Sequence, residues 1–257
     1  NGTANLDVVD IDGAVDMAST LQVDGALTGS STIYGVGINV IETGSILISN
    51  DGTTGTISAA VRNTGLGFEV FDDLTSGDDN TGMGRRSLTK VTTGSGNTAM
   101  GSGSIELLTT GDSNTAFGVS SLYATTTGAS NTAVGASSLA ANTTASFNTA
   151  VGALAGTAIT TGNDTTLMGF EAGKALTEGN ENTGIGYRAL LAATTGDENT
   201  AVGHSALAAV TTASDNTAVG SNAGASITTG TLNTFIGHLT GDATTTANDN
   251  TGVGAAS

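Results

Sequence analysis

Four carboxylate side chains occur at a regular spacing that brings them together if the chain coils. They are Asp164, Glu181, Glu198 and Asp215, and each interval is 17 residues. Stacked one coil apart, these like charges repel one another unless solvent screens them or a cation bridges them. Ca²⁺ is bound by carboxylate oxygens, so a calcium site is one interpretation. The other is a set of solvated surface charges that keeps the protein soluble.

The two histidines are poor candidates for a shared metal site. His204 and His238 lie 34 residues apart, which corresponds to roughly 10 Å if the strands of successive repeats are about 4.8 Å apart. We therefore predict two surface histidines. The chain has no Cys, which excludes thiolate metal sites and a cysteine nucleophile. No Ser-His-Asp arrangement is evident either, so we predict a protein without catalytic activity, with Ca²⁺ as the one cofactor left open.

A glycine-rich run at residues 94–103 imitates a phosphate-binding loop but lacks its chemistry. It has no Lys at the required place, opens no long helix and recurs as ordinary repeat. Arg85, Arg86 and Lys90 form a basic cluster, which we expect to contact the acidic segment 72–79. With 23 acidic against six basic residues, the chain is not expected to bind nucleic acid through its phosphates. The sequence has no apolar run of 18 residues, so we expect no membrane insertion.

All these residues belong to a repeat with a period of 17. A pentad close to Asn-Thr-Ala-Val-Gly begins at Asn80 and returns every 17 residues until Asn250, with Thr165 replacing the Asn once. No insertion or deletion breaks the register over ten full units and a truncated eleventh. An unbroken period of this kind indicates a solenoid, in which coils stack because no coil can bury its apolar face alone.

The pentad itself predicts a short β-strand. Thr and the apolar fourth residue share one face of it, and Asn and the small third residue share the other. A Gly closes every pentad and indicates a turn, and four residues later comes Leu or Ile in six units and Gly in four. We expect two short strands and two turns per coil, with the pentad Val and this Leu as the core. A one-turn helix at residues 187–193 or 205–210 is the alternative.

The predicted fold class is therefore all-β, a β-solenoid or β-roll of 17-residue coils with a β-rich N-terminal stem. Residues 1–60 alternate apolar with acidic or small residues and are assigned to the stem. Residues 61–79 carry a run of acids and are assigned to an acidic junction, and residues 80–257 form the repeat shaft. A coil with one Val and one Leu of core is thin, so we expect copies of the chain to associate and bury further apolar area.

Most of one unit shows a resemblance to a known class of protein. The segment 182–196, Asn-Thr-Gly-Ile-Gly-Tyr-Arg-Ala-Leu-Leu-Ala-Ala-Thr-Thr-Gly, resembles repeats in bacteriophage tail fibres. More distantly, the pentads are similar to the Asn-Ser-Val-Ala-Ile-Gly units of trimeric autotransporter adhesin heads, although those units are usually shorter. The resemblance covers residues 80–257 and, loosely, 1–30. It implies a homotrimeric, non-enzymatic, extracellular fibre on a virion tail or cell-surface appendage, which attaches to a host receptor or glycan.

Two aromatic residues of the repeats are candidates for receptor contacts. Tyr123 and Tyr187 would serve this role if they are exposed, and packing at the edge of the core explains them equally well. Within the same mechanical class, a bacterial surface adhesin or an extracellular filament subunit is the alternative. In a different class, a monomeric solenoid that binds Ca²⁺ or ice remains open. The Thr-Thr corners, of which Thr92 leads the first, provide one outward rank of Thr for ice, and the leading Thr also suits a hydrogen-bonded turn.

Overall fold

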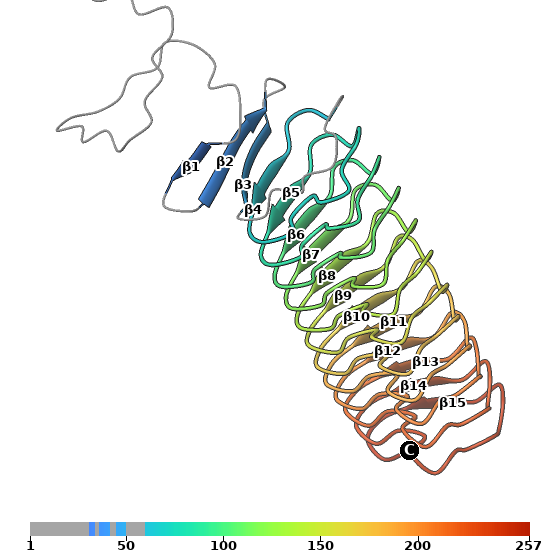
Figure 1. Cartoon of the computed structure of the whole chain (residues 1–257). Helices are drawn as coiled ribbons and strands as arrows, with labels where there is room; N and C mark the ends of the chain where they lie inside the picture. Colours follow the sequence, from blue (N-terminus) through green and yellow to red (C-terminus); the bar gives the residue numbers. More distant parts are fainter. Residues whose placement is uncertain (1–30, 34–35, 42–44, 50–59) are drawn as a thin grey trace, which may run out of the picture.

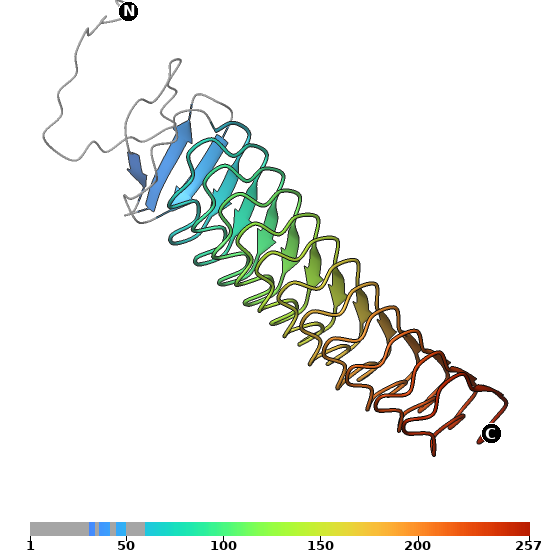
Figure 2. The same cartoon turned by 90° about the vertical axis from the view of Figure 1, so that its right-hand side faces the viewer.

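The computed structural model describes residues 31–33, 36–41, 45–49 and 60–257, and in these ranges the chain is an all-β rod. Figures 1 and 2 show the rod from two sides, with one short strand in each coil and the strands stacked along its length. The strands are β1 (Ser31–Ile33), β2 (Val36–Ile41), β3 (Ser45–Ser49), β4 (Thr64–Leu66), β5 (Thr81–Met83), β6 (Thr98–Met100), β7 (Thr115–Phe117), β8 (Thr132–Val134), β9 (Thr149–Val151), β10 (Thr166–Met168), β11 (Thr183–Ile185), β12 (Thr200–Val202), β13 (Thr217–Val219), β14 (Thr234–Ile236) and β15 (Thr251–Val253).

All fifteen strands form one sheet in chain order. β1, β2 and β3 pair antiparallel, β3 then pairs parallel with β4, and every later pair is parallel. From β4 onward each residue lies beside the residue 17 positions later, as Thr132 does beside Thr149. This register confirms the predicted β-solenoid, because each coil adds one strand directly on top of the last.

The solenoid begins one coil earlier than the sequence analysis placed it. The segment 61–79, assigned there to an acidic junction, contains β4, whose Thr64 pairs with Thr81 in the register of the repeat. Residues 63–67 read Asn-Thr-Gly-Leu-Gly and are a pentad, followed by acidic residues in place of the usual small ones. The hairpins of β1–β3 lie within the predicted stem, and residues 1–30 lie outside the described residues.

Each coil has a single strand rather than the two expected, and the described residues contain no helix. The reason is a set of four residues per coil with positive φ. In the coil of residues 80–96 they are Gly84 (φ 127°), Arg86 (58°), Leu88 (51°) and Gly96 (69°). Neither an α-helix nor an extended strand accommodates such residues. They turn the chain tightly enough to close a coil in 17 residues.

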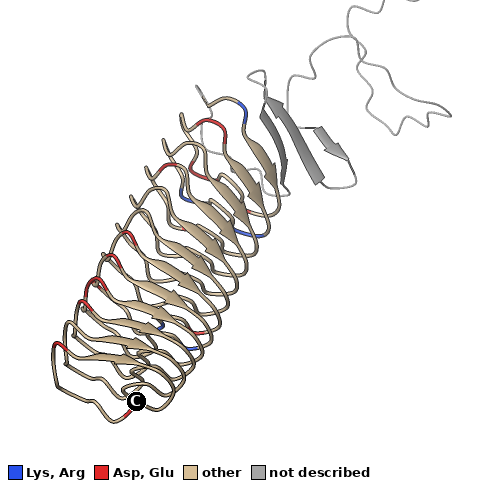
Figure 3. Cartoon of the chain, turned by 180° about the vertical axis from the view of Figure 1, so that it is seen from behind, with Lys and Arg blue, Asp and Glu red and all other residues tan. Residues whose placement is uncertain are grey.

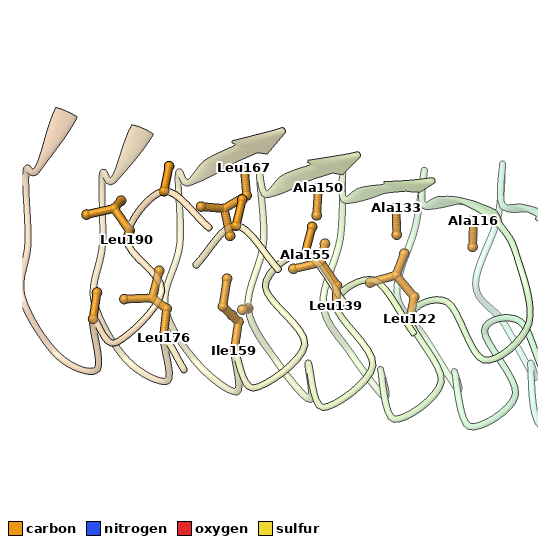
Figure 4. Packing of buried hydrophobic residues seen from close by; sticks show 14 of the residues in the cluster. Ala116, Leu122, Ala133, Leu139, Ala150, Ala155, Ile159, Leu167, Leu176 and Leu190 are labelled. Atoms are coloured by element: carbon orange, nitrogen blue, oxygen red, sulfur yellow. The ribbon is translucent and has the colours of Figure 1, made fainter. Parts of the chain in front are cut away.

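The interior is lined by small side chains on the strands and larger ones opposite them. Figure 4 shows the row Ala116, Ala133 and Ala150 facing Leu122 and Leu139, and all five are fully buried. The Leu column was predicted correctly. A second buried apolar column lies three residues after it and includes Val91, Leu108, Ile159, Leu176, Val210 and Ile227.

The pentad's apolar fourth residue was predicted to be core, and this was wrong. Met83, Val134 and Ile185 are each 37% exposed, whereas the neighbouring Ala133 is fully buried. The alternation along the strand was read correctly, but the face was not, because the buried face is the one that carries Asn and Ala. Asn is drawn inward by hydrogen bonds that the sequence pattern does not reveal.

At two places in the rod, a large side chain occupies the strand position that is usually small, and Gly occupies the position that is usually Leu. Leu167 replaces the usual strand Ala, and the Leu column is Gly at Gly156 and Gly173, where an added Cβ would lie 2.9 and 2.7 Å from the Leu167 methyls. Phe235 makes the same exchange with Gly224 and Gly241. The core volume is therefore kept nearly constant from coil to coil, as close packing requires.

Buried Asn side chains join the coils along the rod axis. Asn114 is typical: its Nδ2 donates to the Gly128 carbonyl (2.8 Å) and its Oδ1 accepts from the backbone N–H (3.1 Å) and Nδ2 (3.0 Å) of Asn131. The same ladder runs from Asn63 to Asn250 and weakens once, where the hydroxyl of Thr165 accepts from the Asn182 N–H at 3.4 Å.

The leading Thr of each corner forms a second ladder. Its hydroxyl donates to the carbonyl of the Thr 17 residues later, at 3.0–3.2 Å through ten successive coils from Thr75 to Thr228. The hydrogen-bonded turn that the sequence offered for this residue is confirmed. These hydroxyls are engaged in the backbone and do not form a free rank.

Candidate functional site

The four carboxylates predicted as metal candidates do form a column on one edge of the rod. Asp164, Glu181, Glu198 and Asp215 all have positive φ (55–62°), and each backbone N–H donates to a carbonyl of the preceding coil. Figure 3 shows this edge as a series of acidic turns. Within the described ranges no three Asp, Glu or His side chains are close enough together to hold a metal ion.

A shallow groove of about 550 Å³ follows this edge between two columns of polar side chains. In its floor the backbone N–H of Asn163 donates to Oδ1 of Asn180 (2.9 Å), and the N–H of Asn180 donates to Oδ1 of Asp197 (2.7 Å). The carboxylate of Asp197 therefore already accepts a hydrogen bond from the backbone of the neighbouring coil. The groove is lined by Ser146, Phe147, Asn163, Asp164, Asn180, Glu181, Asp197 and Glu198.

Three aromatic rings from successive coils stack on one another, and each belongs to the residue that directly follows a pentad Gly. Tyr187 lies between Phe170 (centroids 5.7 Å apart) and His204 (5.0 Å), with interplanar angles of 17° and 16°. The guanidinium of Arg188 lies 5.0 Å from the centre of the Tyr187 ring, in cation–π contact. Tyr187 is 41% exposed, so of the two predicted receptor contacts this one lies in an accessible patch.

A charged cluster lies beside this stack. The carboxylate of Glu171 accepts from Nζ of Lys174 and from Nε of Arg188, both at 2.7 Å. These two cations hold the pKa of Glu171 below its ordinary value, and the Lys174 hydrogen bond contributes most. The carboxylate in turn raises the pKa of Arg188. The cluster is an ion triad of one carboxylate and two cations, in which the hydrogen bond to Glu171 holds Arg188 beside Tyr187.

The remaining predicted residues lie apart from these groups. His204 and His238 are both exposed, as predicted for surface histidines. Tyr123 is half-buried, with its ring against the backbone of Gly103. The expected contact of the basic cluster with the acidic segment 72–79 is made by Lys90, whereas Arg86 pairs with carboxylates outside that segment. Lys90 lies 3.0 Å from Asp73, and Arg86 lies 2.9 Å from Glu69 and 2.8 Å from Glu106.

The outward face of the sheet is the surface that the sequence analysis missed. Strands β4–β15 present a Thr column and, two residues along, an apolar column, and none of these strands contains a charged residue. Figure 3 shows the charges on the turns and the strands uncharged. We call this surface the sheet face. The exposed members of its apolar column are Leu66, Met83, Phe117, Val134, Met168, Ile185, Val219, Ile236 and Val253.

No protein-family model, curated protein or solved structure matches the chain significantly. The described part of the chain contains no helix that could cross a membrane.

Proposed function

We propose that the chain is a structural and adhesive fibre segment, without catalytic activity, that works outside the cell as a homotrimer and attaches to a host receptor or glycan. The observation that carries this proposal is the unbroken stack of twelve in-register parallel strands, β4–β15. At about 4.8 Å per strand the stack spans roughly 50 Å. Its sequence likeness to phage tail-fibre repeats supports the same role.

The hydrogen bonds of the stack suit a mechanical role. The strand pairs, the Asn ladder and the corner Thr ladder all join one coil to the next, so the bonds run along the rod axis. Tension along the axis is shared by several bonds at every junction between coils. A rod of this kind resists stretching and keeps its side chains at a fixed spacing.

Attachment is assigned to the aromatic stack of Phe170, Tyr187 and His204. Aromatic surfaces pack against the apolar C–H groups of sugars, and hydroxyl groups of sugars bind the charged and polar groups around them. Arg188 and Lys174 lie beside the stack and offer hydrogen-bond donors. Copies of this patch on one fibre would bind several receptors at once, so weak single contacts add up to firm attachment.

Binding to immobilised glycans and to bacterial cells tests this proposal. Labelled protein is compared with Tyr187→Ala and with the matched control Tyr123→Ala, whose half-buried ring lies in the coil of residues 114–130 and takes no part in the stack. We expect a saturable interaction that Tyr187→Ala weakens at least tenfold and the control leaves nearly unchanged. Absence of binding to every surface, or hydrolysis of a bound glycan, contradicts the proposal.

Ice binding is the second candidate, and the Thr column of the sheet face favours it. Twelve Thr residues, from Thr64 to Thr251, lie in one row at the spacing of the coils. The column beside it varies from Val to Phe in size, which disturbs a regular match to a lattice. Thermal hysteresis measured by nanolitre osmometry decides this: a freezing-point gap in the pure protein supports the ice candidate and its absence removes it.

A further inference from the structure

The sheet face is an apolar surface of unusual length. Of the twelve apolar side chains on it, nine are between 37% and 70% exposed, and the other three are half-buried. Soluble single-chain proteins rarely expose contiguous apolar patches larger than a few hundred Å². An exposed apolar column of this length is a feature of surfaces that bind another protein.

The area of the sheet face matches that of a stable protein interface. Twelve strands spaced about 4.8 Å apart give a length near 50 Å, and the two side-chain columns with their margins give a width of roughly 13 Å. The product is about 600–700 Å² on each partner. Specific interfaces bury roughly 600–1,000 Å² per partner, so the face lies at the lower end of the range that holds two proteins together.

The charge distribution selects a second copy of this chain as that partner. The described solenoid has sixteen acidic and six basic residues, and five of the six basic side chains are paired with carboxylates. Two such rods repel each other at the turns. The strands carry no charge in any of the twelve coils, so two rods can meet there without repulsion along their whole length, and a basic partner would instead be drawn to the carboxylate edge.

The spacing of the side chains supports the same partner. The Thr and apolar columns repeat at the distance between strands, so the ridges of one rod fit a partner with an identical repeat over the full length. Another copy of this chain has the same repeat because its sequence is identical. A globular partner would match only a few coils, and its fit would end where its surface curves away.

We propose that copies of this chain associate through the sheet face of β4–β15, with the apolar columns packed against one another. This inference rests on the proposed fibre function, for which it names the surface that joins the chains. Its interface buries the column led by Leu66 and leaves the carboxylate edge in solvent.

Light scattering of the full chain over a range of concentrations tests this interface. The variant Val134→Glu/Ile185→Glu/Val219→Glu places three charges on the sheet face. The matched control Thr127→Glu/Thr195→Glu/Thr212→Glu places three on exposed corner positions, where Glu178 already occurs naturally. Far-UV circular dichroism and thermal melting of each protein establish that the solenoid is intact, and Val134→Glu alone serves if the triple variant does not fold.

We expect the wild type and the corner control to have a mass of at least twice 24.9 kDa. The face variant should associate at least about 100-fold more weakly, because each buried like charge opposes association. A wild type that stays monomeric, or an oligomer that the face variant does not weaken, overturns the inference. A monomer that still binds a glycan leaves adhesion standing, whereas an oligomer that binds no surface contradicts adhesion alone.

Discussion

The buried Asn ladder allows a quantitative test of what holds the coils together. Replacing Asn114 by Ala removes the donor to the carbonyl of Gly128 and the acceptor for the backbone N–H of Asn131. Both backbone groups then lack the partner that the side chain supplied, deep between two coils. An unpaired buried group costs about 1–3 kcal/mol, so Asn114→Ala should lower the free energy of unfolding by about 2–6 kcal/mol.

The protein contains its own intermediate case at Thr165. There the hydroxyl still accepts from the N–H of Asn182, at 3.4 Å, but it donates to Asn163 and offers no donor across the coil. Asn114→Thr should therefore cost about half as much as Asn114→Ala, because one of the two backbone groups keeps a partner. In the opposite direction, Thr165→Asn should restore the ladder and stabilise the rod by about 1 kcal/mol.

Urea unfolding followed by far-UV circular dichroism measures these differences, with hydrogen exchange to locate them. Asn180→Ala is the control, because that half-buried Asn lies at the edge, where water replaces its hydrogen bonds, and it should cost less than about 1 kcal/mol. The reasoning fails if Asn114→Ala costs no more than the control. It also fails if Asn114→Thr is as damaging as Asn114→Ala.

Three further outcomes follow from the packing, the charges and the backbone. Leu167→Ala should lower the free energy of unfolding by about 3–5 kcal/mol, and adding Gly173→Leu should recover part of this loss. Urea unfolding of the two single variants and the double variant measures the coupling, and additive effects would contradict the exchange of volume between these two positions. The stabilising effect of Glu171 relative to Glu171→Gln should be fully present above pH 4.5 and be lost as the pH falls below it, since its folded-state pKa is lowered; a difference that persists unchanged at pH 2 contradicts this. At Ser130, where φ is 58°, Val should be less stable than Gly by about 1–2 kcal/mol in thermal or urea unfolding, and equal stabilities would refute the strain.

The period and the strand of each coil were predictable because both leave marks in the sequence. An interval of 17 residues without a gap implies stacking, and alternation over the pentad implies a strand. The coil at residues 61–79 also carries its pentad, at Asn63, but the acidic residues that follow it differ from the small residues of the other units. The exchange of Leu167 with Gly173 was likewise visible as a large residue in a small column and a Gly in a Leu column.

Other features depend on geometry that the residue types do not specify. A Leu such as Leu88 does not signal a positive φ, so the sequence predicted a second strand at the place where the coil turns. The inward direction of Asn114 follows from hydrogen bonds to Gly128, whose position is known only after the coil has closed. The stack of Tyr187 on its neighbours depends on three successive coils placing their rings in register.

The absence of charge from the sheet face requires an explanation beyond stacking. Repulsion between charges on successive coils does not explain this absence, because the carboxylate edge has acids at the same repeat position in four successive coils, from Asp164 to Asp215. Single charges are also tolerated at the corner, as Glu178 shows. Both outward positions of all twelve strands nevertheless lack a charged residue. The strand preference for Thr and β-branched residues accounts for part of this restriction, at up to about 1 kcal/mol per residue. A surface that is desolvated against another copy excludes charge more strictly, because an unpaired charge buried there costs several kcal/mol.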